Sequence, residues 1–578
     1  MRYPTLYTKE SNRKMVDVFK GYNHNLRIGE GEFFDMKNMT ADYYPVLSPR
    51  KKRGVYASPE SPKGLIAKDA LCYVDGTKFV INEYPVEMEL NDEPKQLISM
   101  GAYVIIMPDK KWINTLDTTE FGNIEASFTC SSDVTFSLCT VDGADYENMT
   151  LSSTEPKDPE NMALWIDTSS KPHTLKQYSA TSSMWVQIAT TYIKISSPGI
   201  GAAFNQYDGV TISGIVAEEL QDLNASMVIW AKGDDYIVVV GILDAVTEQT
   251  AEEGEITIAR KMPNMDFVTE SGNRLWGCRY GIAANGEVVN EIYASKLGDF
   301  KNWSCFMGLA TDSYTASCGT DGQFTGAITH MGYPLFFKEN CVHKVYGNYP
   351  ANFQIQDTAC RGVQKGCENS LAIVNETLFY KARSGICAYD GSLPTEASYA
   401  LGNEAYSEAV GGANGNKYYV SMKDIAGDWN LFVYDTAKSM WHKEDNFHAD
   451  AFCSCRGELY AISQGKIITM LGSGDDYEGK IEWMVQTGEI GITSPDMKYI
   501  SRLTVRLAMD IGSEVRFYAQ YDFCDAWEPL FSMRSDNLRS ISLPIRPKRC
   551  DHMKLRIEGE GMAKIYSITK TIEQGSEL

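Results

Sequence analysis

Long apolar runs are missing from this sequence. No stretch approaches the roughly 20 residues that a helix needs to cross a bilayer. Residues 1–15 are polar and lack the apolar centre of a secretory signal, so we expect synthesis and assembly in a cytoplasm. Sustained 3.6-residue periodicity is also nearly absent, which predicts an almost entirely β protein.

Established catalytic signatures are missing as well. There is no Gly-x-Ser-x-Gly elbow, no His-Glu-x-x-His zinc helix and no dinucleotide fingerprint after a strand. The nearest match, Gly474–Ile481, has the glycine and lysine spacing of a phosphate-binding loop. However, Ile481 replaces the Ser or Thr that would bind magnesium, and a strand pattern follows where a helix is needed. This segment is therefore interpreted as a linker.

Two further patterns fall short of a site. One group of side chains has zinc-ligand chemistry but lacks the paired spacing of a zinc site: His442, His448, Cys453 and Cys455. The segment Ser295–Trp303 resembles the Ser-x-Asp-x-Gly-x-x-Trp box of glycosidase propellers only loosely, and no second copy exists. We predict that the protein is not an enzyme and has no catalytic, cofactor-binding or metal-binding residues. A propeller-type glycan hydrolase stays as an alternative.

Charge is abundant and its balance is acidic, since 76 Asp and Glu against 54 Lys and Arg give a net charge of −22. Such a protein is a poor binder of nucleic acid and suits a surface that DNA slides past. Residues 1–53 are the exception, with eleven Lys/Arg against six Asp/Glu. They end in the basic run Arg50, Lys51, Lys52 and Arg53, which we interpret either as part of a docking arm (residues 1–55) or as a solvated loop. The 14 cysteines are mostly scattered, which favours buried thiols over a disulfide framework.

A repeat of about forty residues is the strongest positive signal. Four segments share a turn, an apolar pair and a second strand, and their equivalent residues lie 43, 40 and 41 apart: Leu335, Leu378, Tyr418 and Leu459. Three upstream segments, at Leu71, Tyr103 and Leu275, look like the same element. Short strands at this period are typical of four-stranded β-propeller blades. We predict about seven blades, with six or eight as alternatives, and an N-terminal strand that closes the ring.

Two regions break this rhythm. Residues 120–262 contain strand-like segments without the repeat, which predicts a β-domain inserted between blades 56–119 and blades 263–480. Residues 481–578 alternate apolar and polar residues over four strands, which predicts a C-terminal β-sandwich.

Three groups of residues resemble one protein family. The N-terminal segments Phe19–Asn23, Gly31–Thr40 and Tyr44–Arg50 resemble the opening of tail nozzle or hub proteins of tailed bacteriophages, also described as packaged-DNA stabilisation proteins. Gly272–Gly277 with Tyr293–Trp303 is similar to a blade of that group. The segments 543–550 and 556–561 resemble its C-terminal sandwich.

This resemblance implies a structural virion protein. It would form a homo-oligomeric ring, taken as six-fold, below the portal and its adaptor, continue the DNA channel and help to retain packaged DNA. Its partners would be further copies of itself, neighbouring tail proteins and DNA bound without sequence specificity, and its location the virion tail. An acidic bore fits this role. The alternative is a receptor- or glycan-binding tail protein that uses residues 120–262.

Overall fold

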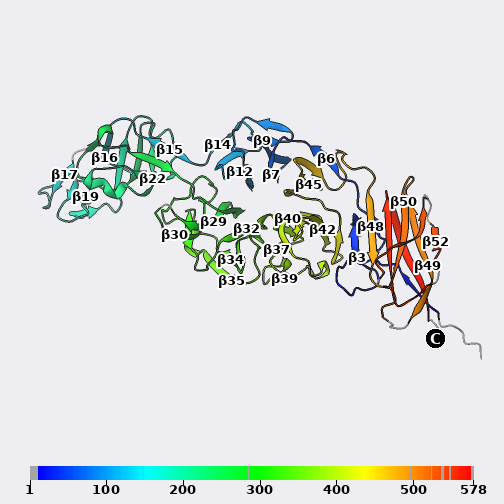
Figure 1. The fold of residues 1–578 in the computed structure, drawn as a ribbon. Helices are drawn as coiled ribbons and strands as arrows, with labels where there is room; N and C mark the ends of the chain where they lie inside the picture. The colour runs from blue at the N-terminus through cyan, green and yellow to red at the C-terminus, as the bar shows by residue number, and fades with distance from the viewer. Residues whose placement is uncertain are drawn as a thin grey trace, which may run out of the picture. The chain divides into compact units, whose positions relative to one another are not determined.

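The computed structural model describes residues 11–146, 149–283, 285–493, 497–522, 524–534, 539–545 and 548–574. Arg546 and Pro547, which belong to the C-terminal resemblance, lie outside the described residues. The described chain consists almost entirely of strands and the loops that connect them (Figure 1). It forms two compact units: residues 1–95, 337–342 and 358–578, and residues 96–336 and 343–357. None of the helices in the described part has the length and apolarity that a bilayer span requires. The five helices found there are short 3-10 turns: Glu218–Leu223, Ala251–Glu253, Pro350–Asn352, Glu368–Ser370 and Tyr399–Leu401.

Seven antiparallel four-stranded blades occur in the described residues. The first is β7 (Pro62–Ala67), β8 (Leu71–Asp75), β9 (Lys78–Ile81) and β10 (Tyr84–Val86), and the second β11 (Gln96–Met100), β12 (Tyr103–Met107), β13 (Lys111–Asn114) and β14 (Phe121–Asn123). The third is β28 (Phe267–Ser271), β29 (Arg274–Ile282), β30 (Val288–Ala294) and β31 (Tyr314–Ser317), and the fourth β32 (Phe324–His330), β33 (Tyr333–Lys338), β34 (Cys341–Tyr346) and β35 (Gln354–Ala359). The fifth is β36 (Ala372–Val374), β37 (Thr377–Ala382), β38 (Gly385–Tyr389) and β39 (Thr395–Glu396), and the sixth β40 (Tyr406–Asn414), β41 (Lys417–Asp424), β42 (Trp429–Asp435) and β43 (Met440–Lys443). The seventh is β44 (Ala451–Cys455), β45 (Glu458–Ser463), β46 (Lys466–Thr469) and β6 (Gly54–Ala57).

The repeat seen in the sequence corresponds to the second strand of each blade. Leu335, Leu378, Tyr418 and Leu459 lie at equivalent places in β33, β37, β41 and β45, and all four are fully buried. The seventh blade is completed by β6, which pairs with β46, so an N-terminal strand does close the last sheet. The predicted all-β propeller of about seven blades is therefore confirmed.

The last blade packs against the first. Leu71 and Tyr73 of β8 share an apolar cluster with Ile462 and Ile467 of β45 and β46. A meander alone leaves both its faces exposed, and this contact covers one of them.

The insertion after the second blade consists of three sheets. Two of them pack face to face around a core that includes Phe136, Ile195 and Ile258. Their strands are β15 (Ala126–Thr129), β16 (Val134–Cys139), β21 (Tyr192–Ser196), β22 (Gly209–Ser213), β23 (Ser226–Val228), β24 (Ala231–Lys232), β25 (Tyr236–Val240), β26 (Thr247–Gln249) and β27 (Thr257–Arg260). Because Phe121–Asn123 belongs to the second blade, the insertion begins after Asn123 and not at residue 120.

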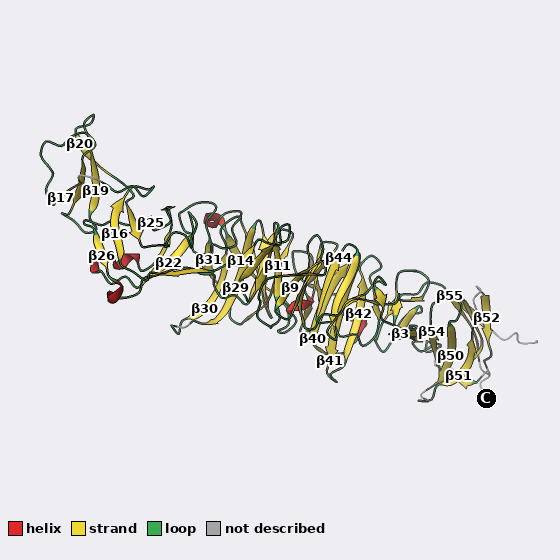
Figure 2. Cartoon of the chain, turned by 90° about the horizontal axis from the view of Figure 1, so that it is seen from above, coloured by secondary structure: helices red, strands yellow, loops and turns green. Residues whose placement is uncertain are grey.

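A separate four-stranded sheet lies within this insertion (Figure 2). It is made of β17 (Met149–Ser152), β18 (Leu164–Asp167), β19 (Thr174–Ser179) and β20 (Met184–Gln187). The sheet buries Leu164, Ile166 and Leu175 against Leu138 of β16. The sequence pattern did not separate it from the rest of the insertion.

The C-terminal strands form two facing sheets. They are β48 (Glu482–Thr487), β49 (Lys498–Met509), β50 (Glu514–Tyr521), β51 (Glu528–Met533), β52 (Arg539–Leu543), β53 (Arg549–Cys550), β54 (Met553–Glu560) and β55 (Ala563–Gln574). The alternation found in the sequence places Leu503, Val505, Phe517 and Leu555 inside, all fully buried. Two sheets with one buried face each are the arrangement that such a period of two predicts.

The N-terminal segment contributes strands to both the sandwich and the propeller. β1 (Ser11–Val16) pairs along its whole length with β55. β2 (Gly21–Tyr22) pairs with β43, and β3 (Glu32–Lys37) pairs with β2 and β48. Blade six and one sandwich sheet thereby become a single ten-stranded sheet.

Two short pairings complete this segment. β4 (Met39–Thr40) pairs with β5 (Ser48–Pro49), and β47 (Asp475–Asp476) adds to β6. In the described part of residues 1–55 the backbone pairs within the chain, as the expected N-terminal strand requires, and a docking role for this segment stays a prediction.

Candidate functional site

The basic run at residues 50–53 contains two buried arginines. The side chains of Arg50 and Arg53 are 6% and 2% exposed, respectively. Arg53 donates to Glu444 at 2.7 Å and to Asp445 at 2.8 Å. Arg50 donates to both oxygens of Glu478, each at 2.8 Å. We call these five residues the arginine–carboxylate network.

The prediction that the run docks onto an acidic neighbour is therefore wrong for Arg50 and Arg53. Their charges are matched within the chain, and Arg53 also lies over the ring of Phe447, 4.3 Å from its centroid. Lys51 and Lys52, by contrast, are exposed. The run thus reads buried, exposed, exposed and buried, and Arg53 directly precedes β6.

The network sets the ionisation of its carboxylates. Burial alone would raise the pKa of Asp445, but the charge of Arg53 and its hydrogen bonds hold that pKa below its ordinary value. Burial acts in the same direction on Glu478, whose pKa is nevertheless lowered by the hydrogen bonds and charge of Arg50. Both carboxylates are thus ionised at neutral pH.

These lowered pKa values predict that acid weakens the contribution of the arginine–carboxylate network to the stability of the fold. A carboxylate whose folded-state pKa is lowered stabilises the fold above its ordinary pKa, near 4, and loses this contribution as pH falls through the lowered value. We expect the thermal midpoint of the wild-type protein to fall steeply between about pH 5 and pH 2. An Arg53→Met variant should show a flatter profile in the same range, as measured by circular dichroism melting. Parallel profiles would contradict the role given to the network.

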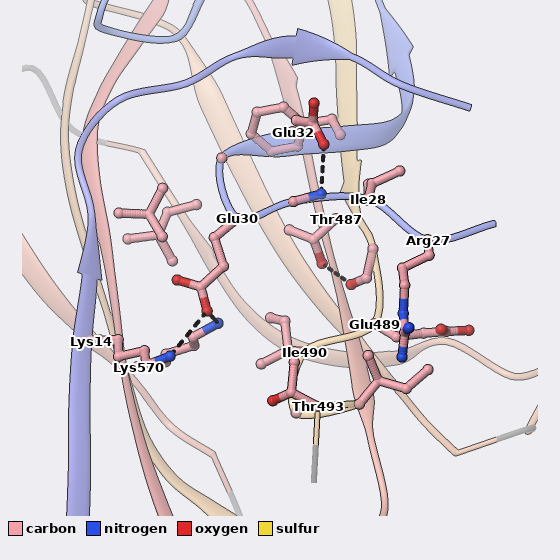
Figure 3. Close-up of a pocket in the computed structure, with 18 of the residues that line it drawn as sticks. Lys14, Arg27, Ile28, Glu30, Glu32, Thr487, Glu489, Ile490, Thr493 and Lys570 are labelled. Carbon is pink, nitrogen blue, oxygen red and sulfur yellow. Dashed lines mark hydrogen bonds and ion pairs between the residues drawn. The ribbon is translucent and has the colours of Figure 1, made fainter. Parts of the chain in front are cut away.

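A large apolar opening lies in the sandwich (Figure 3). It is a cavity of about 510 Å³ between strands of the two sheets and the loops 27–31 and 488–493. Its apolar walls are formed by Val16, Phe19, Ile28, Phe33, Ile490, Ile492, Ile568 and Ile572. We call it the sandwich cavity.

Charged side chains at the sandwich cavity are balanced. Lys570 of β55 is 8% exposed and pairs with Glu30 at 2.8 Å, and Lys14 lies 3.9 Å from the same carboxylate. The hydrogen bond from Lys570 lowers the pKa of Glu30. Glu489 and Arg27 also line the cavity (Figure 3). An apolar interior with a polar rim is the usual anatomy of a protein–protein anchor site.

The residues weighed as metal ligands have structural roles. His442 is buried, and burial lowers its pKa to about 3. His448 stacks on Trp429, with ring centroids 3.9 Å apart. Cys453 and Cys455 lie in β44, and burial raises the pKa of Cys453 to about 12. In the described residues no group of three or more His, Cys, Asp or Glu side chains is placed to hold a metal ion.

The other near-motifs are structural too. Glu478, within the segment that resembles a phosphate-binding loop, pairs with Arg50. In the segment Ser295–Trp303, Asp299 accepts hydrogen bonds from Lys301 and Asn302, and Trp303 is buried. In both segments these side chains therefore stabilise the local conformation of the chain.

Comparison with known proteins gives fold-level likenesses. No family model matches the chain, and no curated protein matches it. Among solved structures, an exo-β-1,3-galactanase from Phanerochaete chrysosporium is 7% identical with a TM-score of 0.19, and the match covers 53% of this chain and 95% of that one. The WD40 domain of Toxoplasma gondii coronin is 10% identical with a TM-score of 0.22, over 75% and 86%. A Trypanosoma rangeli sialidase is 7% identical with a TM-score of 0.19, over 96% of each chain.

At such identities and TM-scores, these likenesses carry no argument about activity. The chain's own strands define its class: a β-propeller protein with an inserted β-domain, whose sixth blade is continuous with a C-terminal sandwich.

Proposed function

We propose that the chain is a structural protein of a tailed-bacteriophage virion. In this proposal it forms a nozzle or hub ring of the tail, continues the DNA channel below the portal and adaptor, and helps to retain packaged DNA. The observation that carries the proposal is the ten-stranded sheet that makes blade six and the sandwich one body. Backbone hydrogen bonds run across the whole of this sheet, which supports a role as a rigid structural subunit.

The N-terminal residues that resemble the nozzle family lie at this connection. Tyr22 pairs with Trp441 of blade six, and Phe33 and Met36 of β3 are each 1% exposed. Met39 of β4 is buried to the same degree. Three of the segments that carry the resemblance thus coincide with β2–β5. Their apolar residues are buried there, which gives a structural reason for the residue types found in these segments.

The net charge of −22 supports the same proposal. Phosphate contacts need Lys and Arg, so an acidic wall repels DNA and keeps it mobile. The burial of Arg50 and Arg53 does not add to this balance, because the carboxylates that they pair with are largely buried beside them.

The insertion favours a second candidate function, receptor or glycan binding. Met162, Met184 and Val186, in and beside the sheet β17–β20, are 61%, 62% and 54% exposed. Trp165 and Trp185 form an edge-to-face pair on that sheet, with ring centroids 5.4 Å apart. Exposed apolar patches mark interaction sites. A glycan hydrolase would require turnover of a polysaccharide, lost on substitution of a carboxylate.

Purified virions provide the test. We expect mass spectrometry to find the chain in intact particles, and electron microscopy with antibody labelling to place it next to the portal. Labelling only at the distal tail tip would favour the receptor-binding candidate. Absence from particles would contradict both virion proposals, and carboxylate-dependent turnover of a polysaccharide would then establish the enzyme.

A further inference from the structure

Three arginines share the outer face of one sandwich sheet. β1, β55 and β49 are neighbours in that sheet, where Arg13 pairs with Thr571 and Thr571 pairs with Arg502. Residues that pair directly lie on the same face, and Arg506 joins them because it follows Arg502 by four residues on β49. All three arginine side chains are exposed, and we call them the arginine face.

No carboxylate of the described residues neutralises the arginine face. Arg502 donates to the hydroxyl of Ser542 at 3.1 Å, and Arg506 donates to that of Ser540 at 3.0 Å. Within the described part of the chain, none of the three guanidinium groups forms an ion pair. By strand geometry, Arg13 and Arg502 are about 10 Å apart, and Arg502 and Arg506 about 13 Å. These separations are comparable to the Debye length of about 10 Å at 0.1 M salt, so the three charges act together on an approaching surface.

The inserted domain carries the opposite charge. Residues 124–260 contain 20 Asp and Glu against six Lys and Arg, a balance of −14 within the −22 of the whole chain. Six of these carboxylates are exposed in and beside the 3-10 helices Glu218–Leu223 and Ala251–Glu253. We call them the acidic face: Asp133, Glu218, Glu219, Asp222, Glu252 and Glu253.

Hydrogen bonds hold the acidic face together. The Val216 N–H donates to the Gln249 side chain at 3.0 Å, and Gln249 donates to the Gly254 carbonyl at 3.3 Å, so Gln249 joins the segments beside both helices. The Ala251 N–H donates to Asp133 at 3.2 Å. None of the six carboxylates forms an ion pair with a described Lys or Arg. Like charges gathered in this way repel one another and favour a cationic partner.

We propose that the arginine face of one copy binds the acidic face of the next copy. This inference rests on the proposed ring. Two chains that each carry a net charge of −22 repel each other unless their contact brings opposite charges together, and each chain supplies both of these faces. A contact between two different faces is heterologous, and such contacts close into rings when the rotation permits.

Sedimentation velocity of the full-length protein across the micromolar range tests this contact. We expect the wild type to self-associate, and the association to weaken at least tenfold between about 50 mM and about 500 mM salt, because salt screens exposed charges. Arg502→Glu with Arg506→Glu should weaken association at least tenfold at low salt, and so should Glu218→Lys with Glu252→Lys. Both pairs replace exposed side chains, so melting midpoints measured by circular dichroism should stay near that of the wild type.

A charge swap distinguishes this contact from a general effect of net charge. The chain with all four substitutions keeps the wild-type net charge and exchanges the signs of the two faces at these positions, so it should regain association to within about threefold of the wild type. Arg383→Glu with Lys466→Glu is the matched control, because both side chains are exposed on the propeller and their replacement changes the net charge as the arginine pair does. This control should associate as the wild type does.

Several results would overturn the contact. They are a monomeric wild type, wild-type association of either pair, no recovery in the chain with four substitutions, or equal loss in the control. Binding of duplex DNA that disappears in the arginine pair, while self-association persists, would assign the arginine face to nucleic acid instead. The proposed function is judged separately. If the arginine pair enters virion rings normally, the contact is wrong while the ring stands; if the wild type is absent from virions, the ring itself is wrong.

Discussion

Replacing Arg53 with methionine is expected to destabilise the fold by about 3–5 kcal/mol, the usual cost of removing one partner from a buried ion pair. Arg53 is 2% exposed and contacts Glu444 and Asp445. Without it, two carboxylates of low exposure would keep only Arg50 as a nearby cation. Their charges would then face a medium that solvates them poorly.

Lys52→Met is the matched control for this prediction. Lys52 is exposed one residue away, and its replacement should change stability by no more than about 0.5 kcal/mol. Thermal melting at neutral pH measures both variants, with the acid profile of the midpoint as a second readout. Equal midpoints for the two variants would show that the network contributes nothing to stability.

Replacing Trp483 with alanine is expected to cost about 3–5 kcal/mol, as for other large core aromatics. Trp483 lies in β48, the strand that connects β3 to the sandwich. It is 2% exposed, and its indole donates to the Gly561 carbonyl at 2.8 Å. The ring lies directly over Gly559, where an added Cβ would fall 2.2 Å from it.

The consequence extends beyond the sandwich. Since β48 belongs to the ten-stranded sheet, the variant should become sensitive to protease between blade six and the sandwich. Trp429→Ala is the control, because that indole is only half-buried. Limited proteolysis followed by mass spectrometry measures the effect. Cleavage at the same rate in both variants would contradict the joining role of β48.

Local patterns predicted the architecture well. Leu335 and its equivalents revealed the blades because each second strand places the same residue type in the core. Val505 and Leu555 revealed the sandwich because a period of two is a property of a single strand. Both signals lie within a few residues of sequence.

Long-range pairing was the part that the sequence could not supply. Arg53 pairs with Glu444 and Asp445, which lie more than 390 residues further along the chain. Because these partners are so distant in sequence, the basic run around Arg53 was interpreted as an exposed surface. The sandwich cavity was missed for the same reason, because β1 and β55 bring together the two ends of the chain. A local sequence pattern predicts a strand but does not predict which other strand it will pair with.

A reconstruction of the assembled virion is the decisive measurement for the nozzle proposal. It should show the chain as a ring contiguous with the portal and adaptor, with a bore lined mainly by Asp and Glu. A chain found only at the tail tip, or a bore lined by Lys and Arg, would contradict the proposal.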